Sequence, residues 1–181
     1  SGLNSDWANY YAQSDGQTSG YHYNVVVRMS KVTVSPEKQD NESFTETQKV
    51  QDGFEYDLDD KGNVKKDTLG NDIKKPKYKN IKCTINQTTR TKTAQVLCDI
   101  QFVNTSTKQT LRRAEIVGTD RFANESYTAN GNLAALSKET SDKLKYKAEA
   151  FPPNQEMIAR ASQDLHRMIK GTIKQNEKLF K

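Results

Sequence analysis

The sequence predicts an α+β fold in which an antiparallel sheet precedes two helices. Between residues 21 and 117, apolar and polar side chains alternate with the period of two that is typical of strands, and turn signals separate these stretches. From residue 131 onward, the apolar spacing changes to the helical period. We therefore expect about five to seven strands, including a polar β-ribbon, with two C-terminal helices packed on one face of the sheet.

The length and composition predict one domain with a thin core. The chain has 181 residues, of which 33% are hydrophobic and 28% are charged. Residues 1–20 are rich in Ser, Asn, Asp and Gly and show no sustained period, so they are interpreted as an irregular lead-in. Trp7, Tyr10 and Tyr11 would tie this lead-in to the body. Residues 21–181 are expected to form a single α+β domain.

The first strands are predicted from alternation and turn signals. Residues 21–35 alternate Tyr21, Tyr23, Val25, Val27 and Met29 with polar residues, which predicts a long strand. A more exposed strand around Phe44 follows. Asp52-Gly53 is a hairpin signal, after which Phe54–Leu58 should run back as a second strand.

The stretch 59–75 contains a local repeat. Asp59 and Asp67 each begin an Asp-x-x-Gly-Asn pattern, in which Gly and Asn accept the positive φ that a tight turn requires. A calcium loop beginning at Asp57 would place Lys61 at a ligand position and Thr68 where a bidentate Glu belongs. A lysine is electrostatically wrong there, so two β-turns in a polar ribbon are predicted, and no metal site.

We expect this ribbon to project from the sheet and to make contacts, because it has few apolar residues to bury. The residues that would make these contacts are Asp59, Lys61, Asn63, Lys66, Asp67, Asn71 and Lys74.

The two cysteines lie on apolar faces of two further predicted strands, residues 78–87 and 93–104. A four-residue loop from Thr89 to Lys92 would join these strands and place Cys83 opposite Cys98. Opposed residues of an antiparallel pair have their Cα atoms about 4.5–5.5 Å apart, which suits a disulfide. We therefore predict a Cys83–Cys98 disulfide; the alternative is two reduced thiols in the core.

After a turn at residues 104–109 and a strand near Leu111–Val117, two helices are predicted. Residues 131–147 carry an apolar stripe made of Leu133, Leu136, Thr140 and Leu144. A second helix should begin at Asn154 and end near Lys170, with Gly171 loosening or ending it. Its buried face would consist of Met157, Ile158, Ala161, Leu165, Met168 and Ile169.

Motifs for enzyme chemistry are missing from the sequence. Its two histidines, His22 and His166, do not form a zinc motif, and the chain contains no nucleophile elbow or phosphate-binding loop. No catalytic residue, cofactor or metal is therefore predicted. The net charge of +5 is spread among 23 acidic residues, so nucleic-acid binding is not expected.

Two segments resemble a known group of proteins. "KKDTLGNDIKKPKY" at residues 65–78, with the strands that follow it, and "FPPNQEM" at residues 151–157 resemble uncharacterised cell-envelope proteins and lipoproteins of the Bacteroidetes. The resemblance implies export to the periplasm or the outer-membrane surface, with membrane attachment only through a lipid anchor outside this chain. "DTL" at residues 67–69 also resembles the sites at which such bacteria O-glycosylate exported proteins, which makes Thr68 the candidate acceptor.

These observations predict a non-enzymatic periplasmic or cell-surface module that contacts another envelope component, either a protein or a glycan. One alternative is a protein that binds a small ligand or a lipid in a cavity between sheet and helices. A second alternative is a hydrolase whose site has no recognisable motif.

Overall fold

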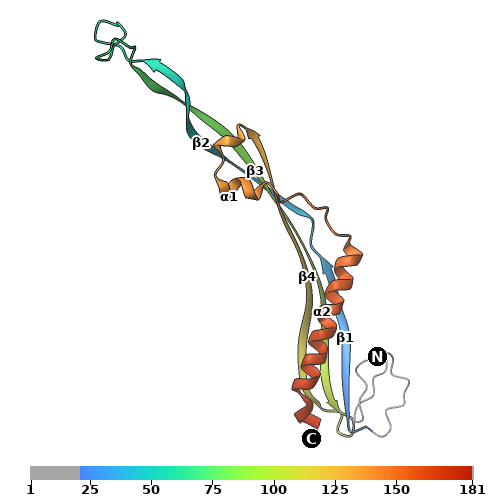
Figure 1. Ribbon diagram of the computed structural model, residues 1–181. Helices are drawn as coiled ribbons and strands as arrows, with labels where there is room; N and C mark the ends of the chain where they lie inside the picture. The colour runs from blue at the N-terminus through green and yellow to red at the C-terminus, as the bar shows by residue number, and fades with distance from the viewer. Residues whose placement is uncertain (1–20, 181) are drawn as a thin grey trace. The chain divides into compact units, whose positions relative to one another are not determined.

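A computed structural model describes residues 21–180. Its elements in chain order are β1 (Tyr23–Val34), β2 (Lys38–Tyr56), β3 (Lys74–Asn104), β4 (Thr110–Gly131), the 3-10 turn η1 (Leu133–Ala135), α1 (Lys138–Lys143), α2 (Asn154–Gln175) and the 3-10 turn η2 (Glu177–Phe180) (Figure 1). Strand β3 pairs with β1, with β2 and with β4. The predicted class, an antiparallel sheet followed by two C-terminal helices, is confirmed.

The described residues form four strands, whereas about five to seven were predicted. Two of the predicted chain reversals do not occur. Asp52 and Gly53 lie inside β2, where Gly53 has a φ of 79°. A glycine with positive φ inside a strand is typical of a β-bulge, so β2 continues to Tyr56 and no strand runs back from Gly53. The predicted loop from Thr89 to Lys92 lies within β3.

The buried face of β3 changes parity along the strand. Cys83 and Ile85 are buried at odd positions, while Ala94, Val96 and Cys98 are buried at even positions. The residues between these two sets are mostly half-buried. The sequence pattern therefore contains the change of face that a hairpin would produce, although the backbone continues as a strand.

The described residues divide into two compact units, and the single domain expected over residues 21–181 stays a prediction. We call them the helix-backed unit, residues 21–38, 91–123 and 151–180, and the ribbon unit, residues 39–90 and 124–150. The predicted lead-in, residues 1–20, lies outside the described residues.

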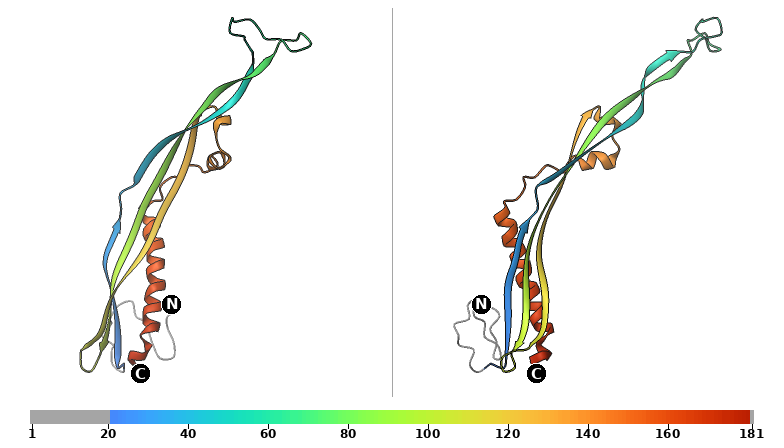
Figure 2. Two further views of the ribbon diagram at one scale, coloured as in Figure 1. Left: turned by 90° about the vertical axis from the view of Figure 1, so that its left-hand side faces the viewer. Right: turned by 180° about the vertical axis from the view of Figure 1, so that it is seen from behind.

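The helix-backed unit has an apolar core between α2 and the sheet. Even-numbered residues of β3 contact the buried side of the helix; the buried core residues are Ala94, Val96, Cys98, Ile100, Phe102, Ile116, Met157, Ala161, Leu165 and Ile173. Figure 2 shows α2 running alongside the strands of this unit in both views. Helix and sheet approach closely at Gly118 of β4, where an added Cβ would lie 2.3 Å from the Ala161 carbonyl oxygen.

Helix α2 begins at Asn154, as predicted, but continues through Gly171 to Gln175. Met157, Ala161 and Leu165 recur every four residues and are buried. Met168 was predicted to be buried with them, and this is wrong, because its side chain is 44% exposed. The helical period places Met168 on the flank of this stripe, while Ile169 packs partly against the core.

Lys92 is a buried lysine in the helix-backed unit. Its ammonium donates to a Glu37 carboxylate oxygen at 2.9 Å and to the Pro152 carbonyl oxygen at 3.0 Å. A buried charge is tolerated only when it is paired and hydrogen-bonded. Lys92 thus fixes the segment that leads into α2 against β3.

The helix predicted at residues 131–147 is shorter in the structure. Asn132 caps η1 and Ser137 caps the six-residue helix α1, and both cap residues have extended backbone conformations that interrupt a longer helix. Thr140 is buried as expected, but Leu133 is exposed. Leu136 and Leu144 are half-buried, so the predicted stripe forms only in part.

Substitution Gly118→Ala should destabilise the protein by about 1–3 kcal/mol or more, because the new methyl group meets the α2 backbone. Gly171→Ala is the matched control, because Gly171 lies in α2 and an added Cβ there would meet nothing within 4 Å. This substitution should stabilise the helix by about 0.5–1 kcal/mol. Denaturant unfolding measures both. Equal effects of the two substitutions would contradict the observed packing of α2 on β4.

Candidate functional site

The ribbon unit contains a stretch in which only two strands pair. Strand β4 ends at Gly131, and the next backbone N–H, that of Asn132, donates to the Lys82 carbonyl oxygen at 3.0 Å. Beyond this point, no third described strand accompanies β2 and β3 as they run to the turns (Figure 2). We call residues 49–79 the ribbon; nearly all of them are exposed.

The end of the ribbon consists of two turns with the same geometry. The Asp59 carboxylate accepts hydrogen bonds from the backbone N–H of Lys61 at 2.9 Å and of Asn63 at 2.8 Å, and from the Asn63 side chain at 3.3 Å. Asp67 makes the equivalent three bonds, at 2.8, 2.9 and 3.1 Å. The prediction of two turns is confirmed.

These hydrogen bonds commit both carboxylates to the turns. Bonds from Asn63 lower the pKa of Asp59, and bonds from Asn71 lower the pKa of Asp67. Across residues 21–180, no group of three His, Cys, Asp or Glu side chains is arranged to hold a metal ion. The carboxylates of Asp59 and Asp67 therefore stabilise the backbone of the two turns.

The other predicted contact residues are distributed around the ribbon. Lys61 is exposed in the first turn, and Thr68, the candidate glycosylation acceptor, is exposed in the second. Lys66 bonds to the Gly70 carbonyl oxygen at 3.3 Å and pairs with Asp72 at 3.2 Å. Lys74 lies beside the Tyr56 ring, on the face of the ribbon described below.

One face of the ribbon carries ion pairs. Asp52 pairs with Lys79 at 2.9 Å, and Lys75 lies 3.9 Å from Glu55 and 3.5 Å from Asp57. A hydrogen bond from Lys79 lowers the pKa of Asp52. Because these pairs are exposed, each contributes little to stability. Their main consequence is that the acidic groups of the ribbon strands are neutralised on this face.

The opposite face carries aromatic rings and lysines. Phe54 and Tyr56 flank Glu55 in β2, so they point to the opposite face from Glu55. The Lys74 ammonium lies 5.3 Å from the centroid of the Tyr56 ring, and the Lys49 ammonium lies 4.9 Å from that of Tyr78. Phe54, Tyr56 and Tyr78 are 65%, 49% and 50% exposed. We call these five residues the aromatic face.

Sequence reasoning found only Lys74 of the aromatic face. The signal was present as alternation of Phe54 and Tyr56 with Glu55, but a turn was predicted at Gly53. That turn would have paired Phe54 and Tyr56 with the residues just before it, away from Lys74 and Tyr78. The continuous strand β2 instead places Lys49, Phe54 and Tyr56 beside β3.

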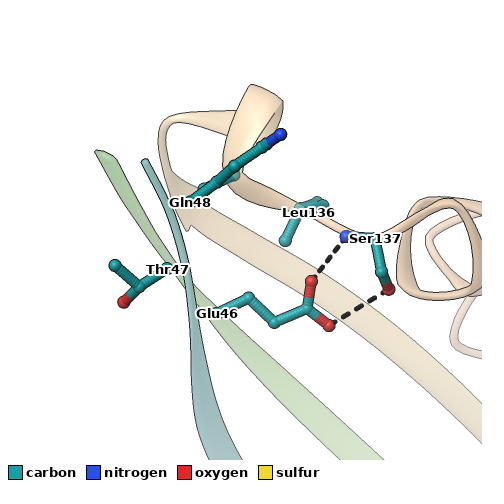
Figure 3. A pocket seen from close by; sticks show the side chains of 6 residues that line it. Glu46, Thr47, Gln48, Leu136 and Ser137 are labelled. Atoms are coloured by element: carbon teal, nitrogen blue, oxygen red, sulfur yellow. Dashed lines mark hydrogen bonds between the residues drawn. The ribbon is translucent and has the colours of Figure 1, made fainter. Parts of the chain in front are cut away.

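A depression of about 320 Å³ lies elsewhere in the ribbon unit, lined by Glu46, Thr47, Gln48, Ala135, Leu136 and Ser137 (Figure 3). The Glu46 carboxylate accepts bonds from the Ser137 backbone N–H at 2.6 Å, from the Ser137 hydroxyl at 3.3 Å and from the Thr140 hydroxyl. The bond from Thr140, followed by that from Ser137, lowers the pKa of Glu46. Glu46 thus anchors the start of α1 on β2.

The predicted Cys83–Cys98 disulfide is wrong. Both cysteines are free thiols, at 1% and 0% exposure, and they lie on the same strand in different compact units. The disulfide required a reversal between Thr89 and Lys92, and β3 continues through these residues. Burial, and secondarily the charge of Asp99, raises the pKa of Cys98. A buried thiol with a raised pKa is a poor nucleophile.

The two histidines are both exposed, whereas both cysteines are buried. The described helices also contain no segment with the length and apolar character needed to span a bilayer.

The substitution Glu46→Gln should destabilise the protein most above about pH 5, where the wild-type carboxylate is ionised in both states. Because folding lowers this pKa, the carboxylate's contribution is lost as the pH falls through the folded-state value, and the two proteins should converge. Thermal unfolding across this range checks the effect. Glu139→Gln, which removes an exposed pair with Lys143, is the control; an equal pH-dependent difference there would contradict the anchoring role of Glu46.

Thiol titration should detect no reactive cysteine in the folded protein and two per chain after denaturation without reductant. The measurement uses protein prepared in an oxidising compartment, so that an available disulfide would have formed. A denatured chain with no free thiols would restore the disulfide and contradict the continuous strand β3.

Comparison with known proteins gave no relative for this chain: no family model, no curated protein and no solved structure matches it. The interpretation of the binding surface therefore depends on the geometry of the described residues.

Proposed function

We propose that this protein is a non-enzymatic module of the bacterial periplasm or cell surface that binds another envelope protein through the aromatic face of its ribbon. One observation carries the proposal: three exposed aromatic rings and two lysines share one face of a two-stranded ribbon. The acids Asp52, Glu55 and Asp57 pair with lysines on the other face.

The energetics of the ribbon favour a binding role. A two-stranded ribbon without a packed layer is at best marginally stable in water, and exposed aromatic residues contribute little to it. Each aromatic side chain offers about 150–250 Å² for burial against a partner. Tyrosine is also enriched among the residues that dominate binding energy at protein interfaces.

The charges of this face favour an acidic protein surface as its partner. Lys49 and Lys74 lie over the rings of Tyr78 and Tyr56, where a sugar or a nucleic-acid base would have to stack. The lysines instead present positive charge beside apolar rings. A protein surface with carboxylates around an apolar patch is complementary to this arrangement.

The exported location is supported by the resemblance to envelope proteins and by the polar surface of the ribbon unit. Its strands β2 and β3 are joined by cross-strand hydrogen bonds between exposed polar side chains; the pairs are Gln39–Arg90, Asn41–Thr88, Ser43–Asn86 and Thr45–Thr84. Because both cysteines are free, a disulfide no longer supports the exported location. Because both thiols are buried, they are compatible with an oxidising compartment.

No observation favours the alternative functions in the described part of the chain. A ligand between α2 and the sheet would need space, but Gly118 lies directly against the helix backbone. The depression beside Glu46 has its carboxylate occupied by Ser137 and Thr140. A hydrolase would need reactive groups together, whereas both cysteines are buried and both histidines are exposed.

Site-specific photo-crosslinking tests the proposed interface in cells of the organism that makes the protein. A photoreactive phenylalanine analogue at Phe54 or Tyr78 should give a discrete crosslinked protein, whereas the same analogue at the equally exposed Leu133 should not. Lys74→Glu should reduce the crosslinked yield several-fold by reversing the charge of the aromatic face.

Lys77→Glu, an exposed lysine of the same strand, serves as the charge-matched control and should leave the yield largely unchanged. The proposal would be rejected if Phe54 and Tyr78 gave no product, or if Leu133 gave the same product. A crosslink to a nucleic acid or a glycan, and not to a protein, would show that the partner belongs to a different class of molecule.

A further inference from the structure

Strand β1 carries three apolar residues that face the core side of the sheet and yet remain open to solvent. Val27, Met29 and Val32 are 42%, 65% and 46% exposed. The register places them opposite three fully buried residues of β3, which are Ile100, Cys98 and Val96. Directly opposed residues share a face of the sheet. We call Val27, Met29 and Val32 the open stripe.

Helix α2 leaves the open stripe uncovered because its other flank is fixed to β4. Arg160 pairs with Asp120 at 3.0 Å, and the Asp164 carboxylate accepts a bond from the Thr119 backbone N–H at 3.1 Å. Gly118 of β4 lies directly against α2. Along β1, by contrast, Val25 and Val34 pack against the core near the ends of the strand, while the middle stays open.

The edge of β1 is irregular at the same place. Among the described strands, β1 pairs with β3 alone, and its register shifts between Met29 and Lys31. Such a bulge interrupts regular pairing and is a common way to protect an edge strand from addition of another strand. The open stripe is therefore suited to side-chain packing more than to pairing with a strand of a second molecule.

We propose that the open stripe is the docking site for the aromatic side chains of this chain's own residues 1–20. This segment joins the polypeptide directly ahead of β1 and contains Trp7, Tyr10 and Tyr11 within five residues. Because it is tethered next to the stripe, the entropic cost of bringing it there is small. Aromatic rings are also large enough to cover three half-exposed apolar side chains.

The length of the segment is sufficient. Val32 lies eleven residues beyond Tyr21, which corresponds to about 36 Å of extended chain. Trp7 lies fourteen residues before Tyr21 in the chain, which allows a reach of up to about 46 Å. Trp7 can therefore reach all of the open stripe while the chain remains connected, and Tyr10 and Tyr11, with reaches of about 36 and 33 Å, can reach Val27 and Met29.

The fluorescence of Trp7 provides a direct test, because it is the only tryptophan in the chain. In the folded protein with residues 1–20 present, the emission maximum should lie at shorter wavelength than in the unfolded chain, and acrylamide should quench the emission weakly. Met29→Asp and, separately, Val32→Asp should shift the maximum to longer wavelength and increase quenching several-fold. Both positions are exposed enough to accept Asp without loss of the fold, which circular dichroism verifies.

Leu69→Asp, at the most exposed large apolar residue of the described part of the chain, is the control and should leave the emission of Trp7 unchanged. The proposal would be overturned if Trp7 in the folded wild-type chain emitted and was quenched as it is in the unfolded chain. It would also be overturned if both stripe variants left its emission unchanged. An emission shift that appears only with increasing protein concentration, together with a dimer in light scattering, would assign the stripe to a second copy.

Discussion

Backbone pairing along β3 is the constraint on which both compact units depend. This one strand of 31 residues pairs with β1, β2 and β4, so each unit contains a section of it. Inside the sheet, a paired strand leaves no backbone donor or acceptor to be satisfied elsewhere, which favours continuation over a turn. The side chains then decide which face is covered. In the helix-backed unit, the even positions of β3 meet α2, whereas in the ribbon unit the buried positions near Cys83 are odd.

The same pairing creates the proposed binding surface. Where β4 ends beside Lys82, strands β2 and β3 continue as a ribbon without a further layer, and their alternation separates two kinds of side chain. Acids and lysines neutralise each other on one face, while Phe54, Tyr56 and Tyr78 remain exposed beside lysines on the other. A surface of this composition adds little to folding stability and is available for binding.

Local polar contacts hold the less regular parts in place. Glu46 anchors the start of α1 through Ser137 and Thr140, and buried Lys92 holds the segment before α2 through Glu37 and Pro152. In both places, a charged side chain from one segment forms hydrogen bonds with polar groups at, or just before, the first turn of a helix. These carboxylates and this ammonium are therefore explained by the fold, whereas the exposed rings of the aromatic face are not.

The sequence by itself determined the features that depend on neighbouring residues. It predicted the antiparallel strands, the start of α2 at Asn154 and the two turns at Asp59 and Asp67, because period, capping and turn chemistry are local. Only the tertiary structure decided whether Gly53 and residues 89–92 reverse the chain. The buried positions change from odd to even numbers between Cys83 and Cys98, and either a hairpin or a continuous strand can produce that change. The elements that cover β3 lie far away in sequence, so neighbouring residues cannot distinguish the two cases. For the same reason, the sequence alone paired Cys83 with Cys98 and missed the aromatic face, both of which depend on where β2 and β3 continue.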